Sequence, residues 1–169
     1  MQDVSRDYTE SFKYQWRKWS RPQFEGDNVG TPLAGYTLKM WERIAGIHDG
    51  LSGQVILDLG SGPGRFTDIV RQKGAECIGI DYSAAVVACA AENFVGDPGV
   101  CLCQASALNL PIKDESLDGV FSTGVLHHTP DPFRGVQDAS KVIKPGGWLA
   151  LAVYGKDHGY DAVVLHLWR

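Results

Sequence analysis

The sequence predicts an α/β domain built on a doubly wound, mostly parallel sheet. Three observations predict this fold. Five short apolar segments alternate with segments of helical periodicity, a glycine-rich turn follows the first apolar segment, and an acidic residue ends the second. Such alternation implies right-handed β–α–β crossovers. The chain has 169 residues, 44% of them hydrophobic, which is enough for one core.

The first predicted strand is Val55–Leu57, an apolar run that Asp58 breaks. The turn that follows contains Gly60, Gly62 and Gly64, and helical spacing resumes after it. Glycine in such a turn adopts positive φ and lets a ligand approach bare backbone. Free N–H groups at the start of the helix also favour negative charge. This segment therefore predicts a ligand-binding loop.

The second predicted strand is Glu76–Ile80, and Asp81 stands at its end. Asp81 follows the glycine turn by about twenty residues, the spacing at which an acidic side chain meets a ribose diol. Two carboxylate oxygens can pair with two hydroxyl groups. The alternative is that Asp81 caps the next helix, but Ser83 can take that role instead. We therefore expect Asp81 to bind a ribose.

The later elements continue the alternation of helix and strand. Helices are predicted at Ser83–Val95 and Pro132–Val142, and strands at Val100–Gln104, Leu117–Ser122 and Trp148–Val153. A turn at Lys144–Gly147 comes directly before the last of these strands. No internal repeat or low-complexity segment interrupts this pattern.

Composition excludes several function classes. The net charge of −4 and the pI of about 5.7 argue against a nucleic-acid partner. No apolar run approaches the length of a membrane span, and no export signal is present, so we expect a cytoplasmic protein with reduced thiols. The four cysteines do not have metal-ligand spacing, and we expect no metal.

The pattern Asp58-x-Gly60-x-Gly62-x-Gly64 closely resembles motif I of the class I S-adenosylmethionine-dependent methyltransferases. The segments QASALNLPIKDESLDGVFSTGVLHHTPDP and KVIKPGGWLALAVY are very similar to a small-molecule subgroup near the menaquinone and ubiquinone biosynthesis C-methyltransferases. This resemblance covers roughly Phe12 to Tyr154. It implies a Rossmann-like sheet with strand order 3-2-1-4-5, S-adenosylmethionine as cofactor, S-adenosylhomocysteine as product and a small-molecule methyl acceptor.

The resemblance also implies which residues contact the cofactor. They lie in the glycine loop and after strands 2, 3 and 4: Asp58, Gly60, Ser61, Gly62, Gly64, Arg65, Asp81, Tyr82, Ser83, Ala105, Ser106, Ala107, Thr123, Gly124 and Val125. Tyr82 is placed against the adenine ring. Where the family most often has an acidic residue that meets the adenine amine, this chain has Ser106, whose hydroxyl accepts a hydrogen bond without charge.

His127 and His128 are the candidate catalytic residues. They follow the fourth predicted strand, on the loop that faces the sulfonium end of the cofactor in this fold. A neutral imidazole near pH 7 can take a proton, so either residue can act as a general base. The alternative is that both histidines shape the loop and bind backbone or the amino-acid end of the cofactor.

Residues 1–50 form an aromatic-rich segment and a helix. We expect a lid in which Tyr14 and Trp16 contact the cofactor, because aromatic faces attract a sulfonium cation and a lid excludes water. The alternative is a flap that packs on the core. The helix is expected to start at Thr31–Pro32. Its apolar face is expected to contain Leu33, Tyr36, Met40, Ile44 and Ile47.

Residues 51–154 are the predicted cofactor-binding core, and residues 155–169 are the start of a truncated C-terminal insertion. We expect the family's C-terminal strands 6 and 7 to be absent and Ala162–Trp168 to begin a helix. The strand Trp148–Val153 would then be an exposed sheet edge. We expect this edge either to form a homodimer, the favoured outcome, or to be covered by Ala162–Arg169.

The sequence thus predicts an S-adenosylmethionine-dependent methyltransferase that acts on a small molecule. Two alternatives stay open. One is a non-catalytic cofactor-binding fragment that acts through a partner. The other is an NAD-dependent oxidoreductase, which the spacing of the glycines disfavours. The sequence does not decide whether carbon, oxygen or nitrogen accepts the methyl group.

Overall fold

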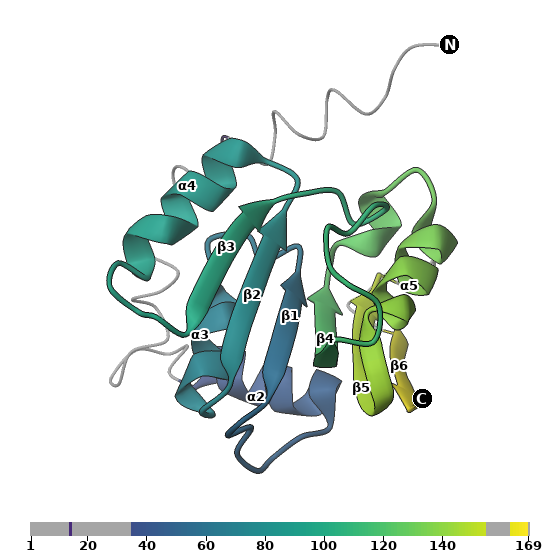
Figure 1. The fold of residues 1–169 in the computed structure, drawn as a ribbon, viewed down its shortest axis with the longest axis horizontal. Coiled ribbons are helices and arrows are strands. Elements are labelled where there is room, and N and C mark those ends of the chain that lie inside the picture. The colour runs from purple at the N-terminus through teal and green to yellow at the C-terminus, as the bar shows by residue number, and fades with distance from the viewer. Residues whose placement is uncertain (1–13, 15–34, 155–162, 169) are drawn as a thin grey trace.

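The computed structural model describes residue 14, residues 35–154 and the backbone of residues 163–168. Its centre is a sheet with the strand order β3-β2-β1-β4-β5-β6 (Figure 1). The first five strands are parallel neighbours, which confirms the predicted doubly wound sheet with the order 3-2-1-4-5. The strands are β1 Val55–Leu59, β2 Glu76–Asp81, β3 Val100–Gln104, β4 Leu117–Thr123, β5 Ile143–Val153 and β6 Val163–Trp168.

Helices cover both faces of this sheet, because successive residues of a buried strand point to opposite faces. On β1, Ile56 joins a cluster with Trp41 and Phe66, whereas Leu57 joins a second cluster with Ala139. The first cluster packs under α2 and α3, which lie behind the strands in Figure 1, and the second packs under α5. The helices are α2 Tyr36–Ala45, α3 Arg65–Gln72, α4 Ala84–Asn93, η1 Leu126–His128 (a 3₁₀ helix) and α5 Pro132–Lys141.

Two strands are longer than the sequence pattern predicts. Asp58, expected to end the first strand, is buried inside β1. The predicted turn at Lys144–Gly147 lies inside β5, where it forms a bulge, because the register between β4 and β5 shifts there. Gly119 permits this arrangement, since the ring of Trp148 lies where a side chain would be: a Cβ on Gly119 would be 2.2 Å from that ring.

The helix α2 and the residues after it place three members of the predicted apolar face at the core: Ile44 is buried, and Met40 and Ile47 pack against the same cluster. The helix begins at Tyr36, directly after Gly35 in a left-handed conformation (φ 70°). Tyr36, expected to be buried, is 55% exposed, whereas Trp41 is fully buried against Phe121 and Trp148. The expected start at positions 31–32 lies outside the described residues, as does Trp16. Tyr14 is described and is exposed.

The C-terminal strand β6 corrects two expectations. Residues 163–168 pair antiparallel with β5, with Trp168 opposite Trp148 and Val163 opposite Val153, so this segment is a strand and not a helix. Its composition (VVLHLW) suits a strand. The ladder pairs the outer backbone groups of β5, so this edge is not available for the homodimer that the sequence favoured. The less favoured outcome, in which the tail covers the edge, is the one observed.

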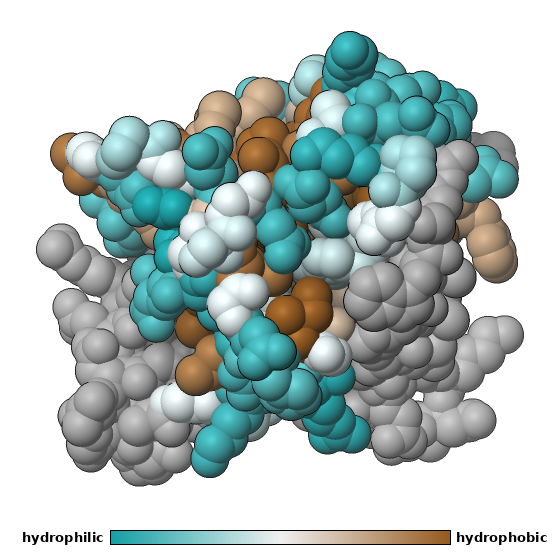
Figure 2. Space-filling view, turned by 60° about the horizontal axis from the view of Figure 1, so that its bottom comes forward, coloured by the Kyte–Doolittle hydropathy of each residue, from teal (hydrophilic) through white to brown (hydrophobic). Residues whose placement is uncertain are grey.

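The amino ends of the parallel strands come forward in Figure 2. Hydrophilic residues make up most of the coloured surface there, and hydrophobic residues show between them in separate patches. Within the described residues, no helix has the length and apolar character that a membrane crossing requires.

Candidate functional site

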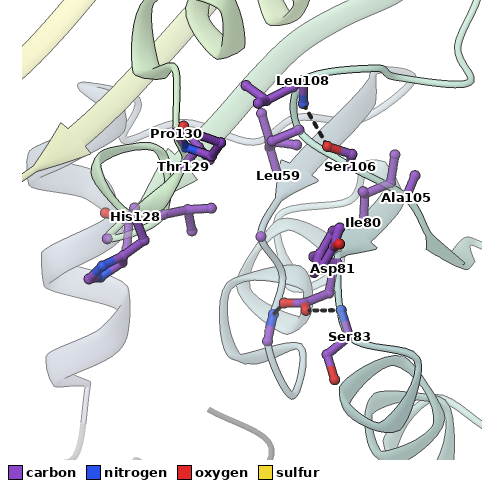
Figure 3. Close-up of a pocket in the computed structure, with 17 residues that line it drawn as sticks. Leu59, Ile80, Asp81, Ser83, Ala105, Ser106, Leu108, His128, Thr129 and Pro130 are labelled. Atoms are coloured by element: carbon purple, nitrogen blue, oxygen red, sulfur yellow. Dashed lines mark hydrogen bonds between the residues drawn. The ribbon is translucent and has the colours of Figure 1, made fainter. Parts of the chain in front are cut away.

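A pocket of about 450 Å³ opens at the carboxyl ends of β1, β2 and β4. The winding of the sheet reverses at this point, which is where open α/β sheets bind ligands. Figure 3 shows the side chains that converge on it from the strand ends and the loops that follow them. The lining residues are Leu59, Gly60, Gly62, Ile80, Asp81, Tyr82, Ser83, Ala105, Ser106, Ala107, Leu108, Thr123, Gly124, Val125, His128, Thr129 and Pro130.

The glycine loop is held by its neighbours as much as by its own sequence. The backbone N–H of Gly60 donates to the carbonyl of Ile80 (2.7 Å) and ties the loop to β2. Gly60 has φ 81°, and a Cβ there would lie 2.2 Å from a methyl group of Val125. Gly64 has φ 92°, and a Cβ there would lie 2.4 Å from the ring of Phe94. Close packing therefore requires glycine at both positions, before any ligand is considered.

Asp58 lies behind the loop and not in the pocket. It is buried, and Thr67 Oγ1 donates to its Oδ2 (2.7 Å). Burial raises the pKa of Asp58 to about 7; the bond from Thr67 opposes this rise, and the charge of Asp81 adds to it. Arg65 also lies away from the pocket, with its guanidinium 4.8 Å from the centre of the Phe66 ring. Neither residue lines the cavity, and their contacts are with side chains of α3.

Asp81 is fixed in the pocket by backbone donors. The N–H of Gly62 donates to Oδ2 (3.1 Å) and the N–H of Ser83 donates to Oδ1 (2.9 Å). Burial raises the pKa of Asp81, and these backbone bonds oppose the rise. A carboxylate accepts about four hydrogen bonds, so each oxygen keeps capacity for one hydroxyl group. The geometry therefore fits a diol.

Ser83 does not cap α4 as predicted. It occupies the N-cap position, but its hydroxyl makes no capping bond, and among the described residues Ser83 Oγ has no hydrogen-bond partner although it is buried. The local turn uses the carboxylate of Asp81 instead. Asp81 thus accepts a hydrogen bond from the backbone N–H of Ser83, directly before α4, without capping that helix, and it also lines the pocket.

The segment after β3 forms a narrow turn that closes one side of the pocket. Ser106 Oγ accepts a hydrogen bond from the N–H of Leu108 (3.2 Å), visible in Figure 3. The hydroxyl therefore shapes the turn and keeps one further lone pair for a ligand. Tyr82, on the neighbouring segment after β2, is 65% exposed, and its carbonyl accepts from Gln104 Nε2 (3.1 Å). The N–H of Ala105 donates to the carbonyl of Asp81 (3.1 Å), so the two segments lie side by side at the pocket.

The loop after β4 brings two histidines to the other side of the pocket. His128 lines the pocket, and Figure 3 shows its ring across the cavity from Asp81. The ring of His127 lies 4.0 Å from that of His128 and 4.5 Å from that of Tyr154 (centre to centre). Burial lowers the pKa of both imidazoles, and His128 lowers that of His127 further. Both rings are therefore uncharged at pH 7.

The structure brings twelve of the predicted site residues to the pocket: Gly60, Gly62, Asp81, Tyr82, Ser83, Ala105, Ser106, Ala107, Thr123, Gly124, Val125 and His128. Six described ones lie outside its lining: Tyr14, Asp58, Ser61, Gly64, Arg65 and His127. The five lining residues that sequence reasoning missed are Leu59, Ile80, Leu108, Thr129 and Pro130. None of these five carries an ionisable group. These residues could have been predicted from the sequence because they lie at the carboxyl ends of the predicted strands or in the loops that follow them.

The strand order β3-β2-β1-β4-β5 and the pocket where the winding reverses are typical of doubly wound, Rossmann-like α/β proteins. A family model described as a methyltransferase domain matches residues 57–151, which is more than half of the chain. The chain therefore belongs to the methyltransferase domain family, as its motifs predicted.

Relatives and solved structures agree with this assignment. An uncharacterized methyltransferase from Mycobacteroides abscessus is 33% identical over 117 residues, which are 68% of this chain and 44% of that protein. The demethylmenaquinone methyltransferase of Clavibacter sepedonicus is 29% identical over 117 residues, which cover 66% of this chain and 48% of that protein. The structure of YcgJ from Bacillus subtilis is 25% identical in sequence, with a TM-score of 0.64; the match covers 72% of this chain and 53% of that one. The chain thus spans less than half the length of these curated relatives.

Proposed function

We propose that this chain binds S-adenosylmethionine and forms the cofactor-binding part of a methyltransferase that acts on a small molecule. The observation that carries the proposal is Asp81, whose carboxylate is held by two backbone N–H groups and still has capacity for a ribose diol. When bound, S-adenosylmethionine supplies a methyl group on a sulfonium; the carbon–sulfur bond breaks with its electron pair left on sulfur, and S-adenosylhomocysteine remains.

In this proposal, different residues of the pocket bind different parts of the cofactor. Asp81 and the backbone of Gly62 hold the ribose end, and the turn at Ser106 receives the adenine. Thr123, Gly124 and Val125 lie at the end of β4, toward the reacting carbon. Thr123 Oγ1 is buried and has no hydrogen-bond partner among the described residues, so a ligand atom can supply one. The protein contributes position and a dry site.

Calorimetry with S-adenosylhomocysteine tests the proposal. Asp81→Ala is expected to weaken binding by about 1–3 kcal/mol, the scale of a hydrogen bond to a charged group. The matched control is Asp114→Asn, an exposed carboxylate outside the pocket lining, which should leave the affinity unchanged. A wild-type chain that does not bind S-adenosylhomocysteine contradicts the proposal, and an unaltered affinity in Asp81→Ala removes Asp81 from the site.

The two alternatives have separate tests. Quenching of protein fluorescence by NADH, with no response to S-adenosylhomocysteine, would favour the oxidoreductase. Turnover assays that compare this chain with a longer protein containing it would separate an enzyme from a cofactor-binding fragment that acts through a partner. Methyl transfer by the longer protein alone would assign the fragment role to these 169 residues.

A further inference from the structure

The glycine loop is bonded to both ends of helix α4. At the start of the helix, the carboxylate of Asp81 accepts from the N–H of Gly62 (3.1 Å) and from the N–H of Ser83 (2.9 Å), the residue directly before α4. The bond from Ser83 is drawn in Figure 3. At the other end of the helix, Asn93 Nδ2 donates to the carbonyl of Pro63 (3.0 Å). Two adjacent residues of the loop are therefore connected to opposite ends of one helix.

A second contact joins the end of α4 to the loop. The ring of Phe94 fills the space beside Gly64, where a Cβ would lie 2.4 Å from a ring carbon. Phe94 directly follows Asn93, the last residue of α4, so the ring and the amide approach the loop from the same end of the helix. The hydrogen bond from Asn93 is directional and orients the Pro63 carbonyl, whereas the ring limits how closely the loop can approach α4.

The Pro63 carbonyl is close in the chain to the group that holds Asp81. Pro63 follows Gly62, whose N–H is one of the two backbone donors to the Asp81 carboxylate. The pyrrolidine ring fixes φ of Pro63, so few free dihedral angles separate the Gly62 N–H from the Pro63 carbonyl. A loop that is held at this carbonyl therefore keeps the Gly62 N–H directed at Asp81.

We propose that Asn93 is a positioning residue for the proposed cofactor site: its amide holds the Pro63 carbonyl and thereby keeps the Gly62 N–H on the carboxylate of Asp81. This inference rests on the proposed function. Asn93 is half-buried and lies outside the pocket lining, so its effect on a ligand passes through the loop. Helix stability alone does not favour asparagine here, because leucine and glutamine have higher helix propensities.

Hydrogen exchange and calorimetry on the 169-residue chain test this inference. Asn93→Leu keeps the approximate size of the side chain and removes the donor. Without ligand, the Gly62 amide should then exchange about tenfold faster, whereas the amide of Val120, which is fully buried in β4, should exchange as in the wild type. The affinity for S-adenosylhomocysteine should also fall about tenfold. Faster exchange at both amides with a lower melting temperature would mean general destabilisation and would overturn the inference.

Further variants separate the role of the amide from that of the side chain's shape. Asn93→Ala adds no apolar surface and should behave as Asn93→Leu does. Asn93→Gln keeps an amide donor on a longer, flexible side chain, so its affinity for S-adenosylhomocysteine should stay within about threefold of the wild type. A glutamine variant that binds as weakly as the leucine variant contradicts a role of the amide.

Gln72→Leu is the matched control. This exposed amide also lies at the end of a helix, but it bonds Asp68 (2.7 Å) and stands at the end of α3 opposite the glycine loop. Its replacement should leave both the Gly62 exchange rate and the S-adenosylhomocysteine affinity unchanged. An equal loss of affinity in Gln72→Leu and Asn93→Leu would show that the effect is not specific to the loop, and the inference would be wrong.

The outcomes also separate this inference from the proposed function. If the wild-type chain binds S-adenosylhomocysteine and Asn93→Leu binds it equally well, the inference fails and the proposed cofactor site stands. If the wild-type chain does not bind it, the proposed function fails. Exchange at Gly62 is measured without ligand, so it still decides in that case whether Asn93 holds the loop.

Discussion

The contact between Gly60 and Val125 is the part of the site whose energetics the structure defines most sharply. We expect Gly60→Ala to destabilise the fold for two separable reasons. The residue must keep φ 81°, which costs about 1–2 kcal/mol for a residue with a Cβ. The new Cβ would also lie 2.2 and 2.6 Å from the two methyl groups of Val125, an overpacking that costs about 1–3 kcal/mol.

A second glycine isolates the first of these terms. Gly53 has nearly the same backbone conformation (φ 79°), but nothing lies within 4 Å of a Cβ placed on it. Gly53→Ala should therefore cost only the conformational term of about 1–2 kcal/mol. The difference between the two variants measures the contact with Val125. Urea denaturation gives both free energies of unfolding.

A double-mutant cycle completes the test. Val125→Ala removes both methyl groups but keeps the Cβ, which would lie 2.9 Å from the new Cβ, so in the Gly60→Ala background it should recover part of the overpacking cost of about 1–3 kcal/mol. Calorimetry with S-adenosylhomocysteine should show weaker binding in Gly60→Ala, since the new Cβ displaces a loop that lines the pocket. The reasoning is refuted if Gly60→Ala costs no more than Gly53→Ala, or if the two substitutions at Gly60 and Val125 are simply additive.

Three further predictions follow from other contacts. Burial raises the pKa of Asp58 to about 7, so the native state binds more protons than the unfolded state between about pH 4 and pH 7. The free energy of unfolding therefore falls as pH rises through this window, and Asp58→Asn should abolish that dependence and be more stable than the wild type at pH 8 by up to about 4 kcal/mol. Urea denaturation at several pH values measures this, and an equal pH dependence in both proteins would contradict the burial argument. Ser106→Asp should raise S-adenosylhomocysteine affinity about tenfold in calorimetry, because a carboxylate keeps the bond to the Leu108 N–H and adds a charged acceptor for the adenine amine. Deletion of residues 163–169 should expose the outer edge of β5 and produce dimers in light scattering, and a deletion variant that stays monomeric would show that the edge is not a pairing surface.

The sequence by itself determined the parallel sheet, its alternation with helices and the place of the glycine loop and Asp81. These features depend on local patterns. An apolar run of strand length, a turn rich in glycine and an acidic residue at the next strand end are each readable within a few residues. The motifs also indicated the methyltransferase family, because several of them occur in the right order. The geometry of this fold also places the loop after β4 at the sulfonium end of the cofactor.

Only the tertiary structure decided which residues share a surface. The contact between Gly60 and Val125 joins residues 65 positions apart, and no local pattern reports it. Asp58 broke an apolar run in the sequence but is buried in β1, because Thr67 on the following helix supplies a hydrogen bond. The strand β6 formed where a helix was expected, since pairing with β5 satisfies a whole row of backbone groups and the β-branched and aromatic residues of this segment suit a strand. Close packing and pairing between distant segments are collective properties of the fold, and periodicity along the chain does not encode them.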